Sequence, residues 1–460
     1  MQVSQLRDGR ARDVRAMAVC ISPDGAGHPG QYGYLDEGRH LTRGHYEAVD
    51  YIVSGFVYIP VSNDSTGTPP LALGMRWKCL SAMACVLILC AAPVRAQTVN
   101  PPDADGQNCT APEAIRFRGA TARLENDLFV DTDRNYTSGV AFTAVSHDIF
   151  GRLNLACLPT AVRLHATLIS YLNPGFWADA DNPEHSQNVV VKFGQSMFTP
   201  LDSARTDLIA DDRPYAGLLY VGMSWNRRKH QPSNNTELLD TRELALGVMG
   251  PLALAQPAQD FIHDVIGVKR FQGWGNQLRN EPAMQMALDR KVKTYQGAGA
   301  IQPGFSADYI RSLGLQLGNI ETSGAAGVEG RIGWNIPNDF GTYPIRPGAE
   351  NRPPSAASMH GGDGKGRTPS ARPRAGVHLF GALESKLVFH DFSLDGNLFE
   401  ASHRVTRRPW VAQAAIGVSA QSPVAGLGVK LAAMRVWRTM EFEEQGSSHA
   451  YGYVTLSVDF

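Results

Sequence analysis

Residues 122–142, ARLENDLFVDTDRNYTSGVAF, place many oxygen-bearing side chains within and between two apolar-rich runs. These side chains belong to Glu125, Asn126, Asp127, Asp131, Asp133, Asn135 and Thr137. Carboxylates and hydroxyls can ligate a hard cation, and an amide can donate a hydrogen bond to an oxyanion. In a soluble hairpin such groups are solvated at the turn. Here the Asn126–Asp127 pair lies inside an apolar run, so the surrounding elements must explain its position.

The last ten residues, YGYVTLSVDF, indicate what those elements are. One face carries Val454, Leu456, Val458 and Phe460, and the other carries Tyr453, Thr455, Ser457 and Asp459. A period of two that ends on an aromatic residue is typical of a transmembrane β-strand between lipid and a polar lumen. An ordinary half-buried strand alternates in the same way. The mature chain has no apolar 20-mer, and only helices and closed barrels cross bilayers. We therefore predict an all-β fold, a transmembrane antiparallel β-barrel.

An export signal supports this fold. Residues 75–96 combine a basic start, an apolar core from Leu80 to Cys90 and a small-residue cleavage site, as a secretory signal peptide does. The apolar core is shorter than the about 20 residues of a spanning helix. We interpret 1–74 as an extension from a start codon assigned too far upstream. The mature chain would then comprise an N-terminal segment, 97–114, and an outer-membrane barrel, 115–460.

Composition excludes several classes of function. The chain has 460 residues and a formal net charge of −1, so nothing electrostatic points to nucleic acid. Only Cys109 and Cys157 would remain after export, and one disulfide between them is possible. The sequence has no cysteine-based zinc spacing, Gly-x-Ser-x-Gly elbow, His-Glu-x-x-His motif or phosphate loop. Zinc-dependent, serine-hydrolase and nucleotide-binding functions therefore lack support.

Further strand-length runs with partial alternation support the barrel. They span 188–200, 215–228, 241–251, 378–389, 410–420 and 428–442. Residues 258–271 have apolar side chains at near-helical spacing and predict a short helix between strands. Residues 349–376 are rich in Gly, Pro, Ser and basic residues, which predicts a long flexible loop.

Strand geometry limits how the Asn-Asp pair can point. Adjacent strand residues face opposite sides, so Asn126 shares the lipid face with Leu124 and Leu128. A bare amide in hydrocarbon is costly. Either the strand bulges here, as strands near active sites commonly do, or the pair lies at the rim above the membrane core. A rim residue that only caps a turn is the structural alternative.

Four motifs occur in a fixed order along the chain. They are LENDLFVDTDRNYTSG, DDRPYAGLLYVGMSW, GVMGPLALAQPAQDFIHDVIG and GWGNQLRNEP, and HDFSLDGNLF follows among the closing strands. Together they resemble the outer-membrane lipid A 3′-O-deacylases of the LpxR type and their wider relatives, over nearly all of residues 115–460.

The resemblance implies a barrel of about twelve strands, with a short helix near an active site at the outer-leaflet rim. There a histidine acts as base, and a calcium ion with polar side chains stabilises the oxyanion. Asn126 and Asp127 match the Asn-Asp pair of the family, Thr137 matches its threonine, and His263 matches its histidine. The implied substrate is lipid A of lipopolysaccharide.

The implied chemistry is physically coherent. Histidine, with a reference pKa of about 6.5, can take a proton from water at neutral pH. Calcium takes oxygen ligands such as those of Asp127 and Thr137. Asn126 can donate a hydrogen bond to the oxyanion, a role worth about 2.7–4 kcal/mol in comparable sites. Arg213, Tyr215 and Gln277 are predicted to bind substrate. Arg213 fits a phosphorylated glycolipid, or alternatively a salt bridge in the wall.

Two positions depart from the family. The glutamate that follows its histidine by six residues is Lys269 here, and a nearby tyrosine is Phe271. A cation in place of a carboxylate should weaken a calcium site. Other carboxylates could take the place of the missing glutamate, and the candidates are Glu125, Asp131, Asp133 and Glu281.

The sequence thus favours an outer-membrane hydrolase that removes an ester-linked acyl chain from lipid A. The strand ending at Phe460 would engage the barrel-assembly machinery. A phospholipase-like esterase is one alternative. A non-enzymatic barrel, either a pore or a scaffold with a degenerate site, is another, and Lys269 is the feature that favours it.

Overall fold

The computed structural model describes residues 116–126, 138–150, 158–177, 185–231, 236–296, 304–344 and 374–460. The predicted extension 1–74, signal 75–96 and segment 97–114 lie outside these residues, as do Cys109 and Cys157. Most of the predicted loop, 349–373, also lies outside them.

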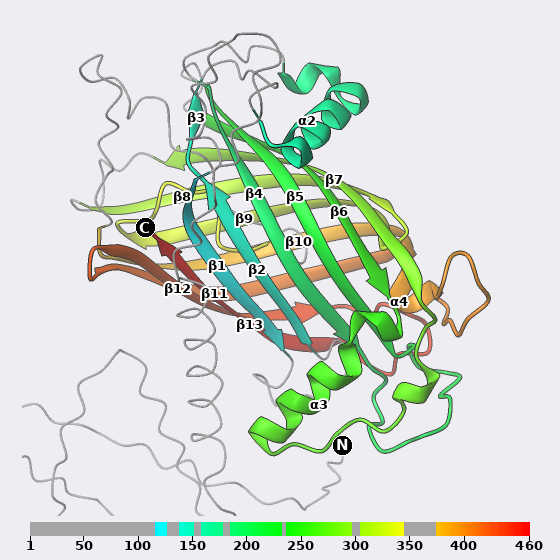
Figure 1. Ribbon diagram of the computed structural model, residues 1–460. Coiled ribbons are helices and arrows are strands. Elements are labelled where there is room, and N and C mark those ends of the chain that lie inside the picture. The colour runs from blue at the N-terminus through cyan, green and yellow to red at the C-terminus, as the bar shows by residue number, and fades with distance from the viewer. Residues whose placement is uncertain are drawn as a thin grey trace, which may run out of the picture. The chain divides into compact units, whose positions relative to one another are not determined.

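Strands dominate the described chain (Figure 1). They are β1 Phe117–Asn126, β2 Ser138–Ser146, β3 Ile149–Phe150, β4 His185–Phe198, β5 Ala216–Gln231, β6 Thr236–Met249, β7 Glu281–Gln296, β8 Phe305–Gly318, β9 Glu321–Trp334, β10 Gly376–Asp391, β11 Trp410–Val424, β12 Leu427–Arg438 and β13 His449–Asp459. The α-helices are α2 Thr160–Leu172, α3 Ala255–Ile266 and α4 Phe392–Asp395, and the 3₁₀ turns are η4 Pro174–Trp177, η6 Pro251–Ala253 and η7 Trp274–Asn276. Within the described ranges, no helix has the length and apolar character needed to cross a membrane.

The strands close into an antiparallel barrel. Each strand pairs with its neighbours in the chain, and β1 pairs with β13, with Leu124 opposite Val454. Both β2 and the short β3 pair with β4, so together they occupy one strand position in the wall. The wall therefore has twelve strand positions around the lumen, and the predicted transmembrane antiparallel barrel of about twelve strands is confirmed.

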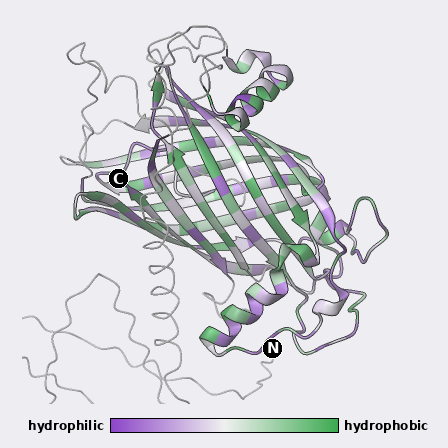
Figure 2. Cartoon of the chain, in the orientation of Figure 1, coloured by the Kyte–Doolittle hydropathy of each residue, from purple (hydrophilic) through white to green (hydrophobic). Residues whose placement is uncertain are grey.

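Alternation along the strands separates the lumen from the outer surface, and hydrophilic and hydrophobic residues alternate along the ribbons in Figure 2. On β13, Tyr453, Thr455 and Ser457 are buried, whereas Val454 and Leu456 on the opposite face are partly exposed. The polar residues point into the barrel because the outer surface must meet hydrocarbon. The face assignment predicted for the terminal strand is thus confirmed.

The structure corrects several predicted boundaries. The helix expected at 258–271 is α3, which begins three residues earlier, at Ala255, and ends at Ile266. It ends there because Gly267 adopts a left-handed conformation with φ of 77°. Gly376, the last residue of the predicted loop, is the first residue of β10. Strands β7, β8 and β9 and helix α2 were not predicted.

The helices α2 and α3 lie at opposite ends of the barrel (Figure 1). We call these the α2 end and the α3 end. The α3 end carries the end of β1, the start of β2, and α4. The α2 end receives the start of β1 and the end of β13, where Gly119 pairs with Asp459.

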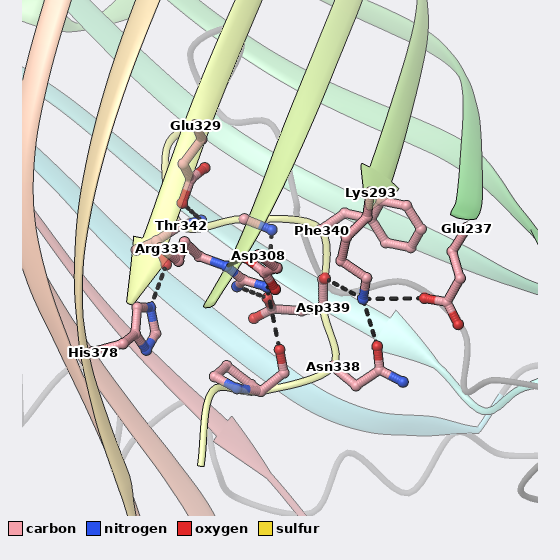
Figure 3. A network of polar contacts seen from close by, with 12 residues as sticks. Glu237, Lys293, Asp308, Glu329, Arg331, Asn338, Asp339, Phe340, Thr342 and His378 are labelled. Atoms are coloured by element: carbon pink, nitrogen blue, oxygen red, sulfur yellow. Dashed lines mark hydrogen bonds and ion pairs between the residues drawn. The ribbon is translucent and has the colours of Figure 1, made fainter. Parts of the chain in front are cut away.

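A segment after β9 enters the lumen near the α2 end (Figure 3). Its Asp339 pairs with Arg331 of β9 and, at 2.7 Å, with Lys430 of β12. The main-chain carbonyl of Asp339 also accepts a hydrogen bond from Lys293 at 2.9 Å. Burial alone would raise the pKa of Asp339, but Lys430 and Arg331 hold that pKa below its ordinary value. Residues 338–342 therefore fill this part of the barrel with a paired polar network.

The lumen is also filled toward the α3 end. Phe198 of β4 meets Phe392 of α4 edge to face, with ring centroids 5.5 Å apart. Between the two fillings lies a partly open space of about 130 Å³, lined in part by the ion pair of Lys192 and Glu243. The barrel interior is consequently a packed polar core rather than an open channel.

Candidate active site

Helix α3 packs against the outer surface of the barrel, at the rim. Leu218 points inward, so its neighbour Gly217 on β5 points outward. A Cβ atom at Gly217 would lie 2.6 Å from the Cβ of Ala255, so only glycine permits this approach of α3. Gln195 of β4 donates a hydrogen bond through Nε2 to the carbonyl of Ala253 at 2.7 Å. The start of α3 is therefore fixed to two adjacent strands.

An apolar cluster holds the loop around α3. Met197, Tyr215, Phe271 and Trp274 are buried together with Ala255. The rings of Tyr215 and Trp274 lie 5.1 Å apart, and those of Tyr215 and Phe271 lie 6.4 Å apart. Burial raises the pKa of Tyr215, so its hydroxyl stays protonated. Tyr215, predicted to bind substrate, thus lies in the packing that positions α3.

His263 lies in the last turn of α3 and is only 3% exposed. Its Nδ1 lies 2.6 Å from the main-chain carbonyl oxygen of Lys269. A carbonyl only accepts hydrogen bonds, so Nδ1 carries the proton and neutral His263 keeps the lone pair on Nε2. The left-handed Gly267 turns the chain back and thereby brings this carbonyl to the ring. Phe271 packs against the imidazole, with ring centroids 5.7 Å apart.

Two further polar residues of α3 were missed by the sequence analysis. Gln259 accepts a hydrogen bond at Oε1 from the Trp274 indole at 2.8 Å. Its Nε2 is buried and has no hydrogen-bond partner among the described residues, and the same holds for Oδ1 of Asp260. These residues precede His263 by four and three positions, which places them on its side of the helix. That spacing is the signal that could have identified them.

Asn126 is the last residue of β1. Its pairing with Gly452 and Ser138 continues the register of the preceding residues, so β1 does not bulge here. Asn126 thus lies at the end of β1 with no bulge at this residue, whereas Asp127, the other member of the pair, lies outside the described residues. Ser138 in turn pairs with Met197 of the apolar cluster. Two strand spacings, about 10 Å, separate the Asn126 and Met197 backbones.

The other predicted ligands, Asp127 and Thr137, lie outside the described residues. Asp127 directly follows Asn126, and Thr137 directly precedes Ser138. Asn126 of β1 and Ser138 of β2 pair with each other.

The remaining predicted substrate residues have different surroundings. Arg213 is buried and donates a hydrogen bond from Nη2 to Glu441 at 2.7 Å. Burial would raise the pKa of Glu441, but Arg438 and Arg213 hold it below its ordinary value. Arg213 is thus engaged in a buried ion pair. Gln277 follows η7 and the cluster residue Trp274, and its Oε1 is buried with no hydrogen-bond partner among the described residues.

Two of the carboxylates considered as replacements for the missing family glutamate have other surroundings. Glu125 faces the lumen cavity. Glu281 accepts hydrogen bonds from Asn319 at 3.0 Å and from the main-chain N–H of Leu398 at 2.9 Å. Asp131 and Asp133 lie outside the described residues. The described ranges contain no group of three or more His, Cys, Asp and Glu residues arranged to hold a metal ion.

The fold and this site define an outer-membrane β-barrel with a histidine-bearing helix on its outer wall at the rim. A family model described as outer membrane protein LpxR matches residues 82–460, and the chain therefore belongs to this family, the outer-membrane lipid A deacylases.

Among solved structures, LpxR from Salmonella typhimurium matches with 17% sequence identity and a TM-score of 0.50, covering 74% of this chain and all of that one. The β domain of the Bordetella autotransporter BrkA matches with 9% identity and a TM-score of 0.35, covering 74% and 97% of the two chains. The translocator domain of NalP from Neisseria meningitidis matches with 8% identity and the same TM-score, covering 85% and 99%. The comparison with curated protein sequences gave no match.

Proposed function

We propose that this barrel hydrolyses an ester-linked acyl chain of lipid A at the site between α3 and the outer wall. One observation carries the proposal. His263 is buried beside the lipid-facing surface with Nδ1 bound to the Lys269 carbonyl, so Nε2 is available as a base. A base in that position serves a substrate that arrives from the membrane. Lipid A occupies the outer leaflet, so the α3 end would face outward.

In the proposed reaction, Nε2 of His263 takes a proton from water as the water oxygen attacks the ester carbonyl. The resulting imidazolium stays bound to the Lys269 carbonyl through Nδ1. Collapse of the tetrahedral intermediate breaks the ester C–O bond, and the imidazolium returns its proton to the leaving alkoxide. The products are a fatty acid and a lipid A molecule with a free hydroxyl.

Side-chain donors would stabilise the oxyanion of the intermediate. Asn126 lies at the rim on the lipid-facing side, as this role requires. Gln259 also has a buried amide nitrogen with no hydrogen-bond partner among the described residues, which qualifies it as a second donor. Each such donor is worth about 2.7–4 kcal/mol in comparable sites. Tyr215 would keep α3 in place, and Gln277 would hydrogen-bond the substrate.

Calcium is part of the proposal. Asp127 and Thr137 would hold the ion. The buried Oδ1 of Asp260, which has no hydrogen-bond partner among the described residues, is a carboxylate oxygen suited to a hard cation. When bound, the ion would supply Lewis-acid stabilisation of negative charge on the substrate. The Lys269 side chain is exposed to solvent, and its main-chain carbonyl contacts His263.

Arg213 has a reduced role in this proposal. Its guanidinium already pairs with Glu441 and packs against the rings of Phe198 and Phe442. A phosphate of lipid A would therefore have to compete with a buried carboxylate. We expect Arg213 to stabilise the mouth of the barrel, and its contribution to substrate binding to be indirect.

The filled lumen argues against the pore alternative. Residues 338–342 and Phe392 occupy the interior at its two ends. The protein should therefore not conduct ions in planar bilayers.

The test is mass spectrometry of lipid A from cells that express the protein, beside His263→Ala. We expect loss of one acyl mass with the native protein only, and unchanged glycerophospholipids in the same extracts. Unchanged lipid A, with protein shown to be folded in the outer membrane and calcium present, would refute the proposal. Accumulation of lysophospholipids instead would identify the phospholipase alternative.

Metal dependence has a separate test. Chelation with EGTA should lower turnover of the purified protein, and calcium should restore it where magnesium at the same concentration does not, because calcium accepts irregular oxygen coordination. Full activity in EGTA would remove calcium from the proposal and leave His263 unaffected.

A further inference from the structure

The outer wall carries a row of arginines on three adjacent strands. From the α3 end, β6, β7 and β8 each present three apolar outward residues and then an arginine. The apolar residues are Val248, Leu246 and Leu244, then Met284, Met286 and Leu288, then Leu317, Leu315 and Leu313, and the arginines are Arg242, Arg290 and Arg311. Six residues span about 20 Å along a strand, which strand tilt reduces to about 15 Å of height. The apolar band here is thus about half of the roughly 30 Å hydrocarbon core.

Strand β10 provides a comparison, because no charged residue interrupts its outward face. Its outward residues from Val377 to Phe389 include no charge, and Leu379, Leu383 and Leu387 among them are exposed. The outward face of β10 thus has no counterpart of the arginine row on β6, β7 and β8. A lipid in contact with β6, β7 and β8 therefore meets charged side chains at a shorter distance from the α3 end than a lipid in contact with β10.

The arginine row has an excess of positive charge. Arg290, with 53% of its side chain exposed, pairs through two nitrogens with Asp240, at 2.7 and 3.0 Å. Arg311 is exposed and packs over Tyr309, and Nε of Arg242 is buried with no hydrogen-bond partner in the described chain. Asp289, which lines the adjoining groove and lies close to Arg242, is a second carboxylate, so three guanidinium groups and two carboxylates leave one positive charge. An arginine on the lipid face costs about 2–4 kcal/mol at mid-depth, so this row calls for an anionic partner.

A shallow groove begins at Arg242 and Arg290, next to Arg311, and crosses the wall toward β10. It has a volume of about 440 Å³, within the range of small-molecule sites. Its lining includes Leu288, Leu315 and Leu387, with Arg290 at the β7 end. Gly324 of β9 contributes to its floor, and a Cβ atom there would have no neighbour within 4 Å. An apolar channel that ends on a guanidinium matches an acyl chain attached to a phosphate.

Helix α2 extends this surface on the other side of the arginines. Leu168 and Leu172 of α2 line a small space together with Arg242 and Leu288. The exposed side of the helix carries apolar residues, such as Leu164 and the 82% exposed Tyr171, beside the exposed Arg163. The arginine row thus lies between the groove and α2.

We propose that the groove between Arg290 and Leu387 binds one glycerophospholipid, with its phosphate on Arg290 and Arg311 and an acyl chain along the leucines. The assignment to the phospholipid leaflet rests on the proposed function, which places the α3 end outward. The lipid is a bound component of the barrel, not the substrate of His263. Arginine suits the phosphate because its planar donors match two oxygens at once.

Native mass spectrometry of the purified full chain tests this site, with 16:0/18:1 phosphatidylglycerol as probe and diacylglycerol with the same chains as control. We expect one phosphatidylglycerol per barrel and at least about tenfold weaker binding of diacylglycerol, since a charge-assisted hydrogen bond is worth about 1.5–3 kcal/mol. The double variant Arg290→Gln/Arg311→Gln should lose that preference. Arg435→Gln, which changes another outward, exposed arginine outside the groove, should keep it.

A second pair of variants tests the groove without altering charge. Gly324→Leu should fill the floor and weaken phosphatidylglycerol binding, whereas Gly330→Leu, equally open on the same strand but outside the groove, should not. Equal binding of the two lipids, or equal effects within either pair of variants, would overturn the proposal. So would an arginine-dependent dimer without bound lipid. His263→Ala should retain phosphatidylglycerol binding, which separates failure of this site from failure of the proposed hydrolysis.

Discussion

Helices α2 and α3 each press a buried histidine against the outer wall of the barrel, at opposite ends. On α3, Nδ1 of His263 lies 2.6 Å from a main-chain carbonyl, which leaves Nε2 as the acceptor. On α2, His165 is equally buried, but neither ring nitrogen has a hydrogen-bond partner among the described residues. Burial lowers the pKa of His165 to about 4, so its ring is neutral at pH 7.

The comparison of His263 with His165 shows which features distinguish a candidate base from a buried structural histidine. Burial alone produces a neutral ring without a defined orientation, as at His165. His263 also has a fixed tautomer, supplied by the turn after Gly267, and lies near buried polar atoms of Gln259 and Asp260 that lack partners among the described residues. We therefore interpret a histidine with a fixed tautomer, beside buried polar atoms that lack partners among the described residues, as part of a reactive site. We interpret a buried histidine in apolar packing, without such a hydrogen bond, as structural.

Among changes outside His263 itself, the largest effect should come from displacing α3. Gly217→Val adds atoms where a Cβ would already lie 2.6 Å from Ala255. We expect turnover of lipid A to fall about 10²-fold, because a shift of about 1 Å in a catalytic group has that cost. The barrel itself should stay folded, as judged by heat-modifiable migration in gels. Gly330→Val, at an open position of β9, is the matched control. Equal activity of the two variants would show that the position of α3 does not matter.

The next effect concerns α2 and pH. The pKa of His165 is lower when α2 is packed than when it is free, so the free state binds more protons between about pH 6.5 and 4. The packing of α2 is therefore fully stable above pH 6.5 and weakens as the pH falls, by about 2 kcal/mol at pH 5. Hydrogen exchange of α2 should accelerate roughly 30-fold relative to the strands. His165→Gln should remove this pH dependence, and its persistence would exclude His165 as the cause.

These two regions differ in how well the sequence predicted them. The strict alternation in β13 identified the barrel, because lipid on one side and a polar lumen on the other impose a period of two. Helix α2 was missed because it has apolar residues on two faces. Val162 and Ile169 pack inward, whereas Leu164 and Tyr171 are exposed, so apolar residues border the short polar stripe around Arg163 and weaken its signal.

The candidate site was predicted only in part, for similar reasons. His263 and Asn126 follow from the family resemblance. Strand parity left a bulge and a rim position open for Asn126, and the pairing of β1 excludes the bulge at that residue. The role of Lys269 was not predictable, because it acts through a main-chain carbonyl that any residue could supply. Nor could the sequence decide the role of Arg213, since its partner Glu441 lies 228 residues further along the chain.

The smallest effect should follow a change at Lys269. Its side chain is exposed, and only its carbonyl contacts His263. Lys269→Ala should therefore change turnover by no more than about twofold, as expected for a surface substitution. A loss of tenfold or more would mean that the lysine side chain takes part in the reaction.

The most direct test compares the two buried histidines in one assay. Turnover of lipid A by the purified protein should fall about 10²–10⁴-fold in His263→Gln, because the general base is lost. His165→Gln, measured at pH 7.5 on folded protein, should stay within about twofold of the native protein. Equal losses in both variants, or full activity of His263→Gln, would contradict the assignment of His263 as the base.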